Sequence, residues 1–386
     1  MFSGIGFQRM ALRDIGANFE SWRTCEWDVN AIRQYKAIHC GDDTQNYSDG
    51  KTKEQLVELL FGAGISNDGK KPMSKEKLVK KSEKWLRDVY NDCCATLNLV
   101  DISKVTGDSL QIEDKDKYCY ILTYSFPCQS LSIAGSQDGM KESSGTASSL
   151  LWEVKRILSE CTELPQILLM ENVTQVHSKK NLPQFEAWIK FLESLGYSNF
   201  WQDMNAKDYR TPQSRNRTFM ISILDPTHQI TFEFPKPVEL NREFEDALVN
   251  EDTVDDRFYI NTPRASQLIQ KLIDNGVLMT SRERERERES NSRFISQRSE
   301  VKESRKLHNG SPYKGWELDR TAKIEEQWSG KFCKKKRDIH FVGNISPINN
   351  RQNPNQGRVY MVDGICPTLT GMEGGGRQPH IIVRSM

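Results

Sequence analysis

Two side chains that can do chemistry stand at the ends of strand-like runs. The run from Tyr118 to Tyr124 ends at a Pro-Cys turn, which presents the thiol of Cys128 at the mouth of a sheet. The apolar run 167–170 leads straight into Glu171. Open α/β sheets keep their ligands at the carboxyl ends of their strands. We therefore expect a thiol nucleophile at Cys128 and a ligand-facing carboxylate at Glu171, rather than a structural cysteine and a helix-start carboxylate.

A second candidate site lies in the first residues of the chain. Gly4 and Gly6 precede a stretch whose apolar residues have helical spacing and which stops at Gly16. Closely spaced glycines at a helix start let a ligand approach the backbone and its N–H groups. The strand-like segment 22–28 carries Glu26 about twenty positions later, where a doubly wound fold places the carboxylate that binds a ribose. Taken alone, the glycines also fit an ordinary tight turn.

The elements that must position these residues alternate between strands and helices up to residue 225. Helices are expected over 149–161 and 185–195, and strands over 167–170 and 217–224. Residues 41–97 are expected to be a helical insertion, with one helix over 53–61 and a second that begins at Ser74 and includes Val89. The alternation predicts an α/β fold, with a mostly parallel sheet covered by helices on both faces.

The composition excludes several classes of protein. Lys+Arg (54) and Asp+Glu (53) nearly balance, so any nucleic-acid surface must be a local patch. The nine cysteines have no CxxC spacing, which argues against a disulfide framework and against a metal site. No apolar run reaches membrane-spanning length, and no signal-peptide pattern begins the chain. We expect a cytoplasmic protein of a reducing compartment, with no metal and no membrane contact.

Three motifs, each at a strand end or in a loop, occur in the order Pro127-Cys128-Gln129, Glu171-Asn172-Val173 and Gln213-x-Arg215-x-Arg217. Together they resemble the cytosine-5 DNA methyltransferase family of the bacterial restriction-modification and phage type. The similarity covers residues 1–40, 98–225 and 357–376, in the order of that family. The fold that this resemblance implies is a Rossmann-like S-adenosylmethionine-dependent methyltransferase sheet with a second, smaller and irregular target-recognition domain.

The resemblance also implies a chemistry. Methylation of cytosine at carbon 5 requires a transient loss of aromaticity, which a thiolate provides by adding to carbon 6. The resemblance assigns this attack to Cys128 and the protonation of ring nitrogen 3 to Glu171. Arg215 and Arg217 would hold the base oxygen and a neighbouring phosphate, the alternative being surface arginines that flank a strand. The family flips its target base out of duplex DNA, and residues 129–145 would close behind it.

The methyl donor implied by the resemblance is S-adenosylmethionine. Glu26 would bind its ribose hydroxyls, and Trp27 would stack on the adenine. Asp101 and Ile102 would face the adenine edge, and the glycine turn would face the methionine part. The full set assigned to this cofactor pocket comprises Phe2, Gly4, Gly6, Glu26, Trp27, Asp101, Ile102, Pro127 and Leu150.

On this basis we expect three parts in the chain. Residues 1–237 would form the catalytic and cofactor domain, residues 238–356 the target-recognition domain, and residues 357–386 a return segment to the catalytic domain. The expected partners are double-stranded DNA and a cognate restriction endonuclease. The expected oligomeric state is a monomer.

The chain departs from the family at both ends. Only Met1 precedes Phe2, where members carry a strand of about five residues. After Gly376 the family's basic stretch and its Gly-Asn-Ser helix do not follow, and Phe7 replaces the second glycine of a pair. We expect a truncated reading frame with intact catalytic residues and a cofactor pocket open on one side, unless a second polypeptide supplies the missing helix. Saturable binding of S-adenosylmethionine at micromolar affinity would contradict this expectation.

Two other functions stay open at this point. A tRNA cytosine-5 methyltransferase would share the fold, although the long region 238–356 favours DNA recognition. A non-catalytic DNA-binding remnant would bind DNA in a salt-sensitive way, without dependence on a cofactor.

Overall fold

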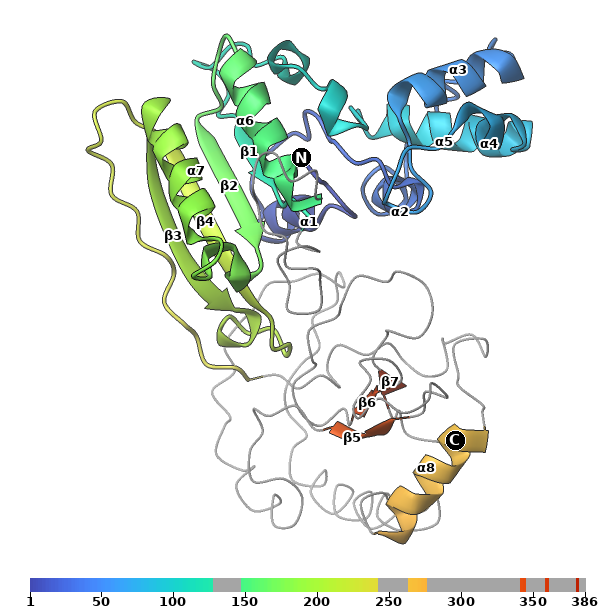
Figure 1. Cartoon of the computed structure of the whole chain (residues 1–386), viewed down its shortest axis with the longest axis vertical. Helices are drawn as coiled ribbons and strands as arrows, with labels where there is room; N and C mark the ends of the chain where they lie inside the picture. The colour runs from blue at the N-terminus through green and yellow to red at the C-terminus, as the bar shows by residue number, and fades with distance from the viewer. Residues whose placement is uncertain (128–146, 242–262, 276–340, 345–357, 361–379, 382–386) are drawn as a thin grey trace, which may run out of the picture. The chain divides into compact units, whose positions relative to one another are not determined.

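The computed structural model describes residues 1–127, 147–241, 263–275, 341–344, 358–360 and 380–381 (Figure 1). The chain divides into two compact units: residues 1–205 with 216–236 form the first, and residues 206–215 with 237–386 form the second. Cys128 and the expected closing loop 129–145 lie outside the described residues, as does most of the expected recognition domain. The three-part division expected from the sequence stays a prediction.

The first unit is built on a four-stranded sheet with the order β1-β2-β4-β3. β1 and β2 are parallel, whereas β4 runs antiparallel to both of its neighbours. The expectation of a mostly parallel sheet is therefore wrong for these strands. The connection 206–215 between β3 and β4 is too short for the crossover that a parallel pair needs. The strands are β1 (Ile121–Tyr124), β2 (Ile167–Asn172), β3 (Tyr197–Asn205) and β4 (Asn216–Leu224).

Backbone hydrogen bonds continue the sheet beyond β1. Met1 donates its nitrogen to a carbonyl of β1, and the Ser3 N–H donates to the Cys25 carbonyl. Thr24 in turn forms a parallel bridge with Asn98: its N–H donates to the Leu97 carbonyl, and its carbonyl accepts the Leu99 N–H. Residues 1–3 thus lie beside β1 and link it to the segment around Cys25. The whole arrangement is consistent with the expected Rossmann-like α/β fold.

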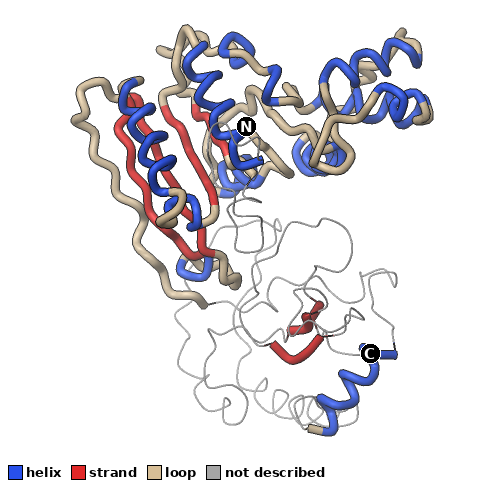
Figure 2. Tube along the Cα trace, in the orientation of Figure 1, coloured by secondary structure: helices blue, strands red, loops and turns tan. Residues whose placement is uncertain are grey.

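Helices accompany the sheet: α1 (Phe7–Asp14), α6 (Leu151–Glu160) and α7 (Leu182–Ser194) (Figure 2). A further helix, α2 (Val29–His39), lies beside the helical insertion (Figure 2). α6 buries its apolar face, and α7 buries Trp188, whose Nε1–H donates to the Tyr124 hydroxyl at 3.0 Å. The main core thus joins α6 and α7 to β1 and β2 and includes Leu168 and Met170. Short 3-10 helices span Ile102–Lys104, Gly107–Leu110, Ala147–Leu150, Thr174–His177 and Ala206–Asp208.

The expected insertion is helical and has a core of its own. Its helices are α3 (Lys53–Ala63), α4 (Lys75–Val79) and α5 (Glu83–Ala95), which gather beside α2 (Figure 1). Residues of α2, α3, α4 and α5 contribute to this second core, Leu56, Leu78 and Leu86 among them. The single helix expected from Ser74 onward is wrong. The Ser82 side chain accepts the Trp85 N–H and starts a new helix after α4.

The described part of the second unit contains α8 (Pro263–Asp274) and the strands β5 (Phe341–Asn344), β6 (Arg358–Tyr360) and β7 (His380–Ile381). These strands form a sheet with the order β5-β6-β7, in which β5 and β6 are antiparallel and β6 and β7 parallel. Across the described ranges of both units, every helix is too short or too polar to cross a bilayer.

Candidate active site

Three neighbouring strands bring their ends together around Glu171. β1 and β2 end at the same edge of the sheet because they are parallel, and β4 begins there because it is antiparallel to β2. Ser125 directly follows β1, and Arg217 is the second residue of β4. The Ser125 hydroxyl donates to Glu171 Oε2 at 2.7 Å, and Arg217 Nε lies 3.0 Å from Glu171 Oε1. The structure therefore joins two of the expected catalytic residues, although their roles stay predictions.

The Glu171–Arg217 pair is only partly exposed to solvent. The side chain of Arg217 is 16% exposed and that of Glu171 is 22% exposed. A charge pair in such surroundings is screened less than a surface pair, so it fixes geometry more firmly. With a donor on each oxygen, the plane of the carboxyl group is held in place. A carboxyl group held in this way can exchange a proton with a ligand at the edge of the sheet.

The segment that leads to the Pro-Cys pair is tied to the same strand end. Asn172 Nδ2 donates to the Phe126 carbonyl at 3.0 Å, and both residues are buried. Asn172 Oδ1 accepts the Val173 N–H at 2.8 Å. The Asn172 side chain thus fixes the position of Phe126 relative to the end of β2. Cys128 itself lies outside the described residues, so its place in the site stays a prediction.

The glycine turn and Glu26 also meet. The Gly4 N–H donates to Glu26 Oε2 and the Asp28 N–H to Glu26 Oε1, each at 2.9 Å. Burial raises the pKa of Glu26, and hydrogen bonds from backbone N–H groups, those of Asp28 and Gly4 foremost, offset part of that rise. Gly4 has a φ of 52° and open space where a Cβ would stand. A ligand can therefore approach the backbone at Gly4 and the carboxylate beside it.

Gly6 has a different reason to be glycine. Its φ is 82°, and a Cβ would lie 2.5 Å from His39 Nε2 and 2.6 Å from the Tyr35 ring. His39 Nε2 in turn lies 3.0 Å from the Ile5 carbonyl oxygen. The missing side chain lets α2 pack against the turn. The structure explains Gly6 by packing, and its contact with a cofactor stays a prediction.

The remaining cofactor candidates are engaged within the fold. Asp101 Oδ1 accepts the Ser103 N–H at 3.0 Å and the Ser103 hydroxyl at 2.8 Å, so this carboxylate caps the 3-10 helix that follows. Ile102 is buried in the main core. Trp27 is partly exposed beside the second core. A partly exposed indole ring, a carboxylate and an open backbone turn suit a nucleoside ligand, which has a flat ring and ribose hydroxyls.

Four further candidates remain. Phe2 and Leu150 pack against the main core, and Pro127 is the last described residue before the gap at 128–146. Arg215 belongs to the segment 206–215 of the second unit, where its carbonyl oxygen accepts the Ala206 N–H at 3.1 Å. The assigned roles of these residues stay predictions.

Sequence reasoning missed Ser125 and Asn172 as site residues. Asn172 lies inside one of the three motifs and Ser125 immediately before Phe126, but a serine or asparagine near a turn is usually a local capping residue. The hydrogen bonds of both residues cross 46 positions of sequence. Within the described residues, no group of three or more acidic, histidine or cysteine side chains could hold a metal ion.

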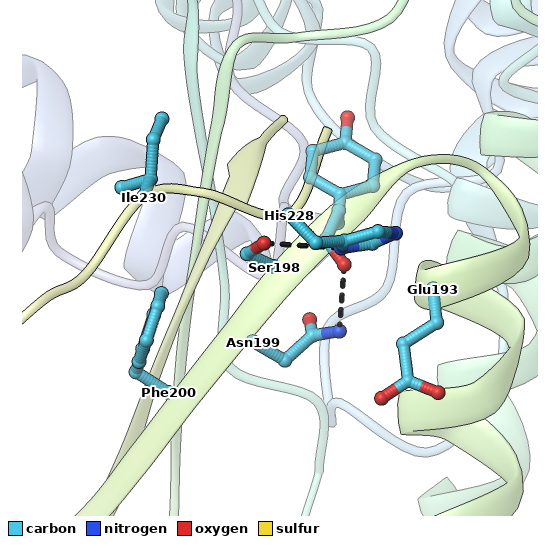
Figure 3. A pocket seen from close by; sticks show the side chains of 7 residues that line it. Glu193, Ser198, Asn199, Phe200, His228 and Ile230 are labelled. Carbon is cyan, nitrogen blue, oxygen red and sulfur yellow. Dashed lines mark hydrogen bonds between the residues drawn. The ribbon is translucent and has the colours of Figure 1, made fainter. Parts of the chain in front are cut away.

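A cavity of about 440 Å³ lies at the opposite end of the strands (Figure 3). Tyr197, which lines the cavity, pairs with Leu224 at the end of β4, whereas Glu171 pairs with Phe219 near the start of the same strand. Ser198 Oγ lies 3.1 Å from His228 Nδ1 and donates to Asp225 Oδ2 at 3.4 Å, so the histidine and the carboxylate both bond the serine. In a catalytic triad the histidine lies between the serine and the carboxylate, whereas here the serine lies between His228 and Asp225. The cavity is lined by Glu193, Tyr197, Ser198, Asn199, Phe200, His228 and Ile230.

Asp225, beside this cavity, holds the loop that follows β4. The Thr227 hydroxyl donates to Asp225 Oδ1 at 2.6 Å, and the Ile230 N–H donates to Oδ2 at 2.7 Å. These hydrogen bonds lower the pKa of Asp225 to about 2. The carboxylate is therefore a loop anchor rather than an acid or base at neutral pH.

Comparison with known proteins gives a consistent set of matches. The family model of C-5 cytosine-specific DNA methylases matches residues 55–356. The orphan methyltransferase M.SssI of Spiroplasma monobiae is 37% identical over 248 residues, which are 62% of this chain and 62% of that protein. The type II methyltransferase M2.ScrFI of Lactococcus lactis subsp. cremoris is 34% identical over 266 residues, 69% of this chain and 70% of that protein.

Solved structures match more distantly. The Dnmt2 methyltransferase of S. pombe aligns with 16% identity and a TM-score of 0.40, over 71% of this chain and 62% of that one. The chain thus spans slightly less than two thirds of the length of M.SssI and of the S. pombe Dnmt2 structure.

Proposed function

The chain belongs to the family of C-5 cytosine-specific DNA methylases, and from this premise we propose that it is a DNA (cytosine-5)-methyltransferase. The observation that carries the proposal is the carboxyl group of Glu171, which Ser125 and Arg217 hold at the edge of the sheet. The same strand end is hydrogen-bonded to Phe126, the residue before Pro127. A carboxyl group in that position is suited to protonate a ring nitrogen while a thiolate attacks the same ring.

In the proposed reaction, the Cys128 thiolate adds to carbon 6 of a flipped cytosine and forms a carbon–sulfur bond. Glu171 gives its proton to nitrogen 3 as this bond forms, so the π electrons of the 5,6 double bond become available at carbon 5. Carbon 5 would then take the methyl group of S-adenosylmethionine as the sulfur–methyl bond breaks, with S-adenosylhomocysteine as the leaving group. Loss of the carbon 5 proton to a base restores the double bond and expels the thiolate, and nitrogen 3 returns its proton to Glu171.

We propose S-adenosylmethionine as the cofactor, which supplies an electrophilic methyl group when bound. Glu26 would bind the ribose hydroxyls through the lone pairs that its two backbone hydrogen bonds leave available. Trp27 would contact the adenine, and the backbone at Gly4 would contact the methionine part. Phe2, Gly6, Asp101, Ile102, Pro127 and Leu150 complete the proposed pocket. Arg217 would orient Glu171 and contact the base, and Arg215 would contact the DNA.

The proposed partners are double-stranded DNA and a cognate restriction endonuclease, and the proposed state is a monomer. The relative M2.ScrFI carries the name of a type II methyltransferase, which supports a role in a restriction-modification system. A chromosomal substrate would place the protein in the cytoplasm.

The test is the transfer of labelled methyl groups from S-adenosylmethionine to duplex DNA. We expect Cys128→Ser to abolish labelling, because a hydroxyl is far less acidic and less nucleophilic than a thiol. Cys119→Ser is the matched control, since Cys119 is an exposed free thiol outside the site, and it is expected to keep full activity.

Equal labelling by the Cys128→Ser variant would contradict the covalent mechanism. Labelling of tRNA in place of DNA would identify a tRNA methyltransferase on the same fold. Salt-sensitive DNA binding that S-adenosylhomocysteine does not strengthen, with no labelling of either nucleic acid, would identify a non-catalytic DNA-binding protein.

A further inference from the structure

We propose that Ser125 is a positioning residue that holds Oε2 of Glu171 in place in both protonation states, so that proton exchange takes place at this oxygen. The inference rests on the proposed function and deepens it. Its basis is the difference between Ser125 and Arg217 as neighbours of the Glu171 carboxyl group: a hydroxyl lies 2.7 Å from Oε2, and a guanidinium nitrogen lies 3.0 Å from Oε1.

The two partners differ in what they can do when Glu171 changes its protonation state. Every hydrogen-bonding group of the Arg217 side chain is a donor, so Arg217 cannot accept a proton from Oε1. A proton on Oε1 would point at an N–H group and replace an attraction with a repulsion. The protonated form of Glu171 therefore carries its proton on Oε2.

Ser125 suits both protonation states of Oε2. Its hydroxyl donates to Oε2 while Glu171 is ionised, and it can rotate to accept from Oε2 when the carboxyl group is protonated. The carboxyl plane need not turn between the two states, because the Arg217 bond to Oε1 is the same in both. Proton exchange with the base thus takes place at one fixed oxygen, and little reorganisation is needed at the moment of reaction.

The backbone on both sides of Ser125 is fixed by buried neighbours. Tyr124 and Phe126 are each 1% exposed and turn into the main core. The Tyr124 hydroxyl accepts the indole N–H of Trp188, and the Phe126 carbonyl accepts the side-chain amide of Asn172. In an extended chain the side chain between two core residues points to the opposite face. The direction of the Ser125 hydroxyl is therefore set by the core and not by the ligand.

The first experiment measures kcat and the two KM values of Ser125→Ala and Ser125→Thr in the methyl-transfer assay. We expect Ser125→Ala to lower kcat about tenfold or more, since a hydrogen bond to a charged group is lost, with the KM values for DNA and cofactor within about twofold of wild type. Ser125→Thr keeps the hydroxyl and is expected to retain most of kcat. Wild-type kcat in Ser125→Ala, or a rise in KM with kcat unchanged, would overturn the proposal.

A second experiment needs no catalytic activity. Urea unfolding of the wild type, Ser125→Ala, Glu171→Gln and the double variant gives the coupling between the two side chains. We expect a coupling of about tenfold or more in the unfolding constant. Independent effects in this cycle would overturn the proposal even if the enzyme were active. An inactive wild type with a clear coupling would instead refute the proposed function and leave the Ser125–Glu171 geometry standing.

Discussion

Replacement of Glu26 by glutamine is expected to weaken cofactor binding strongly while leaving the free protein almost as stable as wild type. Glutamine has the same shape but only one acceptor oxygen. In wild type the two carboxylate oxygens accept the N–H groups of Gly4 and Asp28 at 2.9 Å each. In the variant one of these N–H groups faces an NH₂ group, a loss of about 1–3 kcal/mol.

An opposing effect offsets this loss. Burial raises the pKa of Glu26 above its ordinary 4.5 despite the backbone hydrogen bonds. The free-energy cost of burying the charge therefore exceeds the stabilisation that those hydrogen bonds provide. The neutral glutamine avoids that cost. We therefore expect the unfolding free energy at pH 7 to change by no more than about 1 kcal/mol in either direction.

The direction of the Glu26 pKa shift determines how the stability difference between wild type and Glu26→Gln changes with pH. Because the folded protein binds the Glu26 proton more tightly than the unfolded chain, the contribution of Glu26 to stability is fully present below pH 4.5 and is lost as the pH rises toward the folded pKa. Glu26→Gln lacks this titration. Its stability relative to wild type is therefore expected to improve as the pH rises through that window, as urea unfolding at a series of pH values would show.

Cofactor binding provides the decisive measurement. A ribose hydroxyl that loses a charged acceptor loses about 1.5–3 kcal/mol, which weakens Kd roughly 10- to 150-fold. Calorimetric titration with S-adenosylmethionine measures this change, and Glu20→Gln, at an exposed position, is the control that should bind as wild type does. An unchanged Kd together with a loss of more than about 3 kcal/mol in stability would show that Glu26 is only a structural anchor for the glycine turn.

Three further predictions concern residues that stabilise the first unit. Gly107→Ala would place a Cβ 2.5 Å from the backbone at the end of α6, and this clash should lower the free energy of unfolding in urea by about 1–3 kcal/mol. Gly62→Ala is the control: Gly62 lies in α3 with open space around it, so this variant should be as stable as wild type or more stable. Tyr124→Phe leaves the buried Trp188 N–H without its acceptor and should cost about 1–3 kcal/mol in the same assay. The depressed pKa of Asp225, about 2, stabilises the fold above pH 4, and this stabilisation is lost as the pH falls toward 2. In thermal unfolding, Asp225→Asn should show less dependence on pH between 4 and 2, and an unaltered profile would contradict the loop-anchor role.

Local pattern was enough to locate several elements. The apolar run that became β2, the amphipathic stretches that became α6 and α7, and the helical insertion were all predictable, because period and composition are local properties. The position of Glu171 at the end of β2 followed from the same reasoning. β3 was missed, since its aromatic residues Tyr197, Phe200 and Trp201 alternate poorly with polar residues and follow a helix stop.

The tertiary structure alone decided the pairing. Nothing local in the sequence indicates that β4 inserts between β2 and β3, or that it runs antiparallel to both. That choice sets Arg217 against Glu171, because antiparallel pairing brings the start of one strand to the end of the other. The sequence thus determined which residue types are available for chemistry and at which strand ends they stand. Which oxygen of Glu171 meets a hydroxyl and which meets a guanidinium depends on strand register and core packing, which arise only when distant segments pack together.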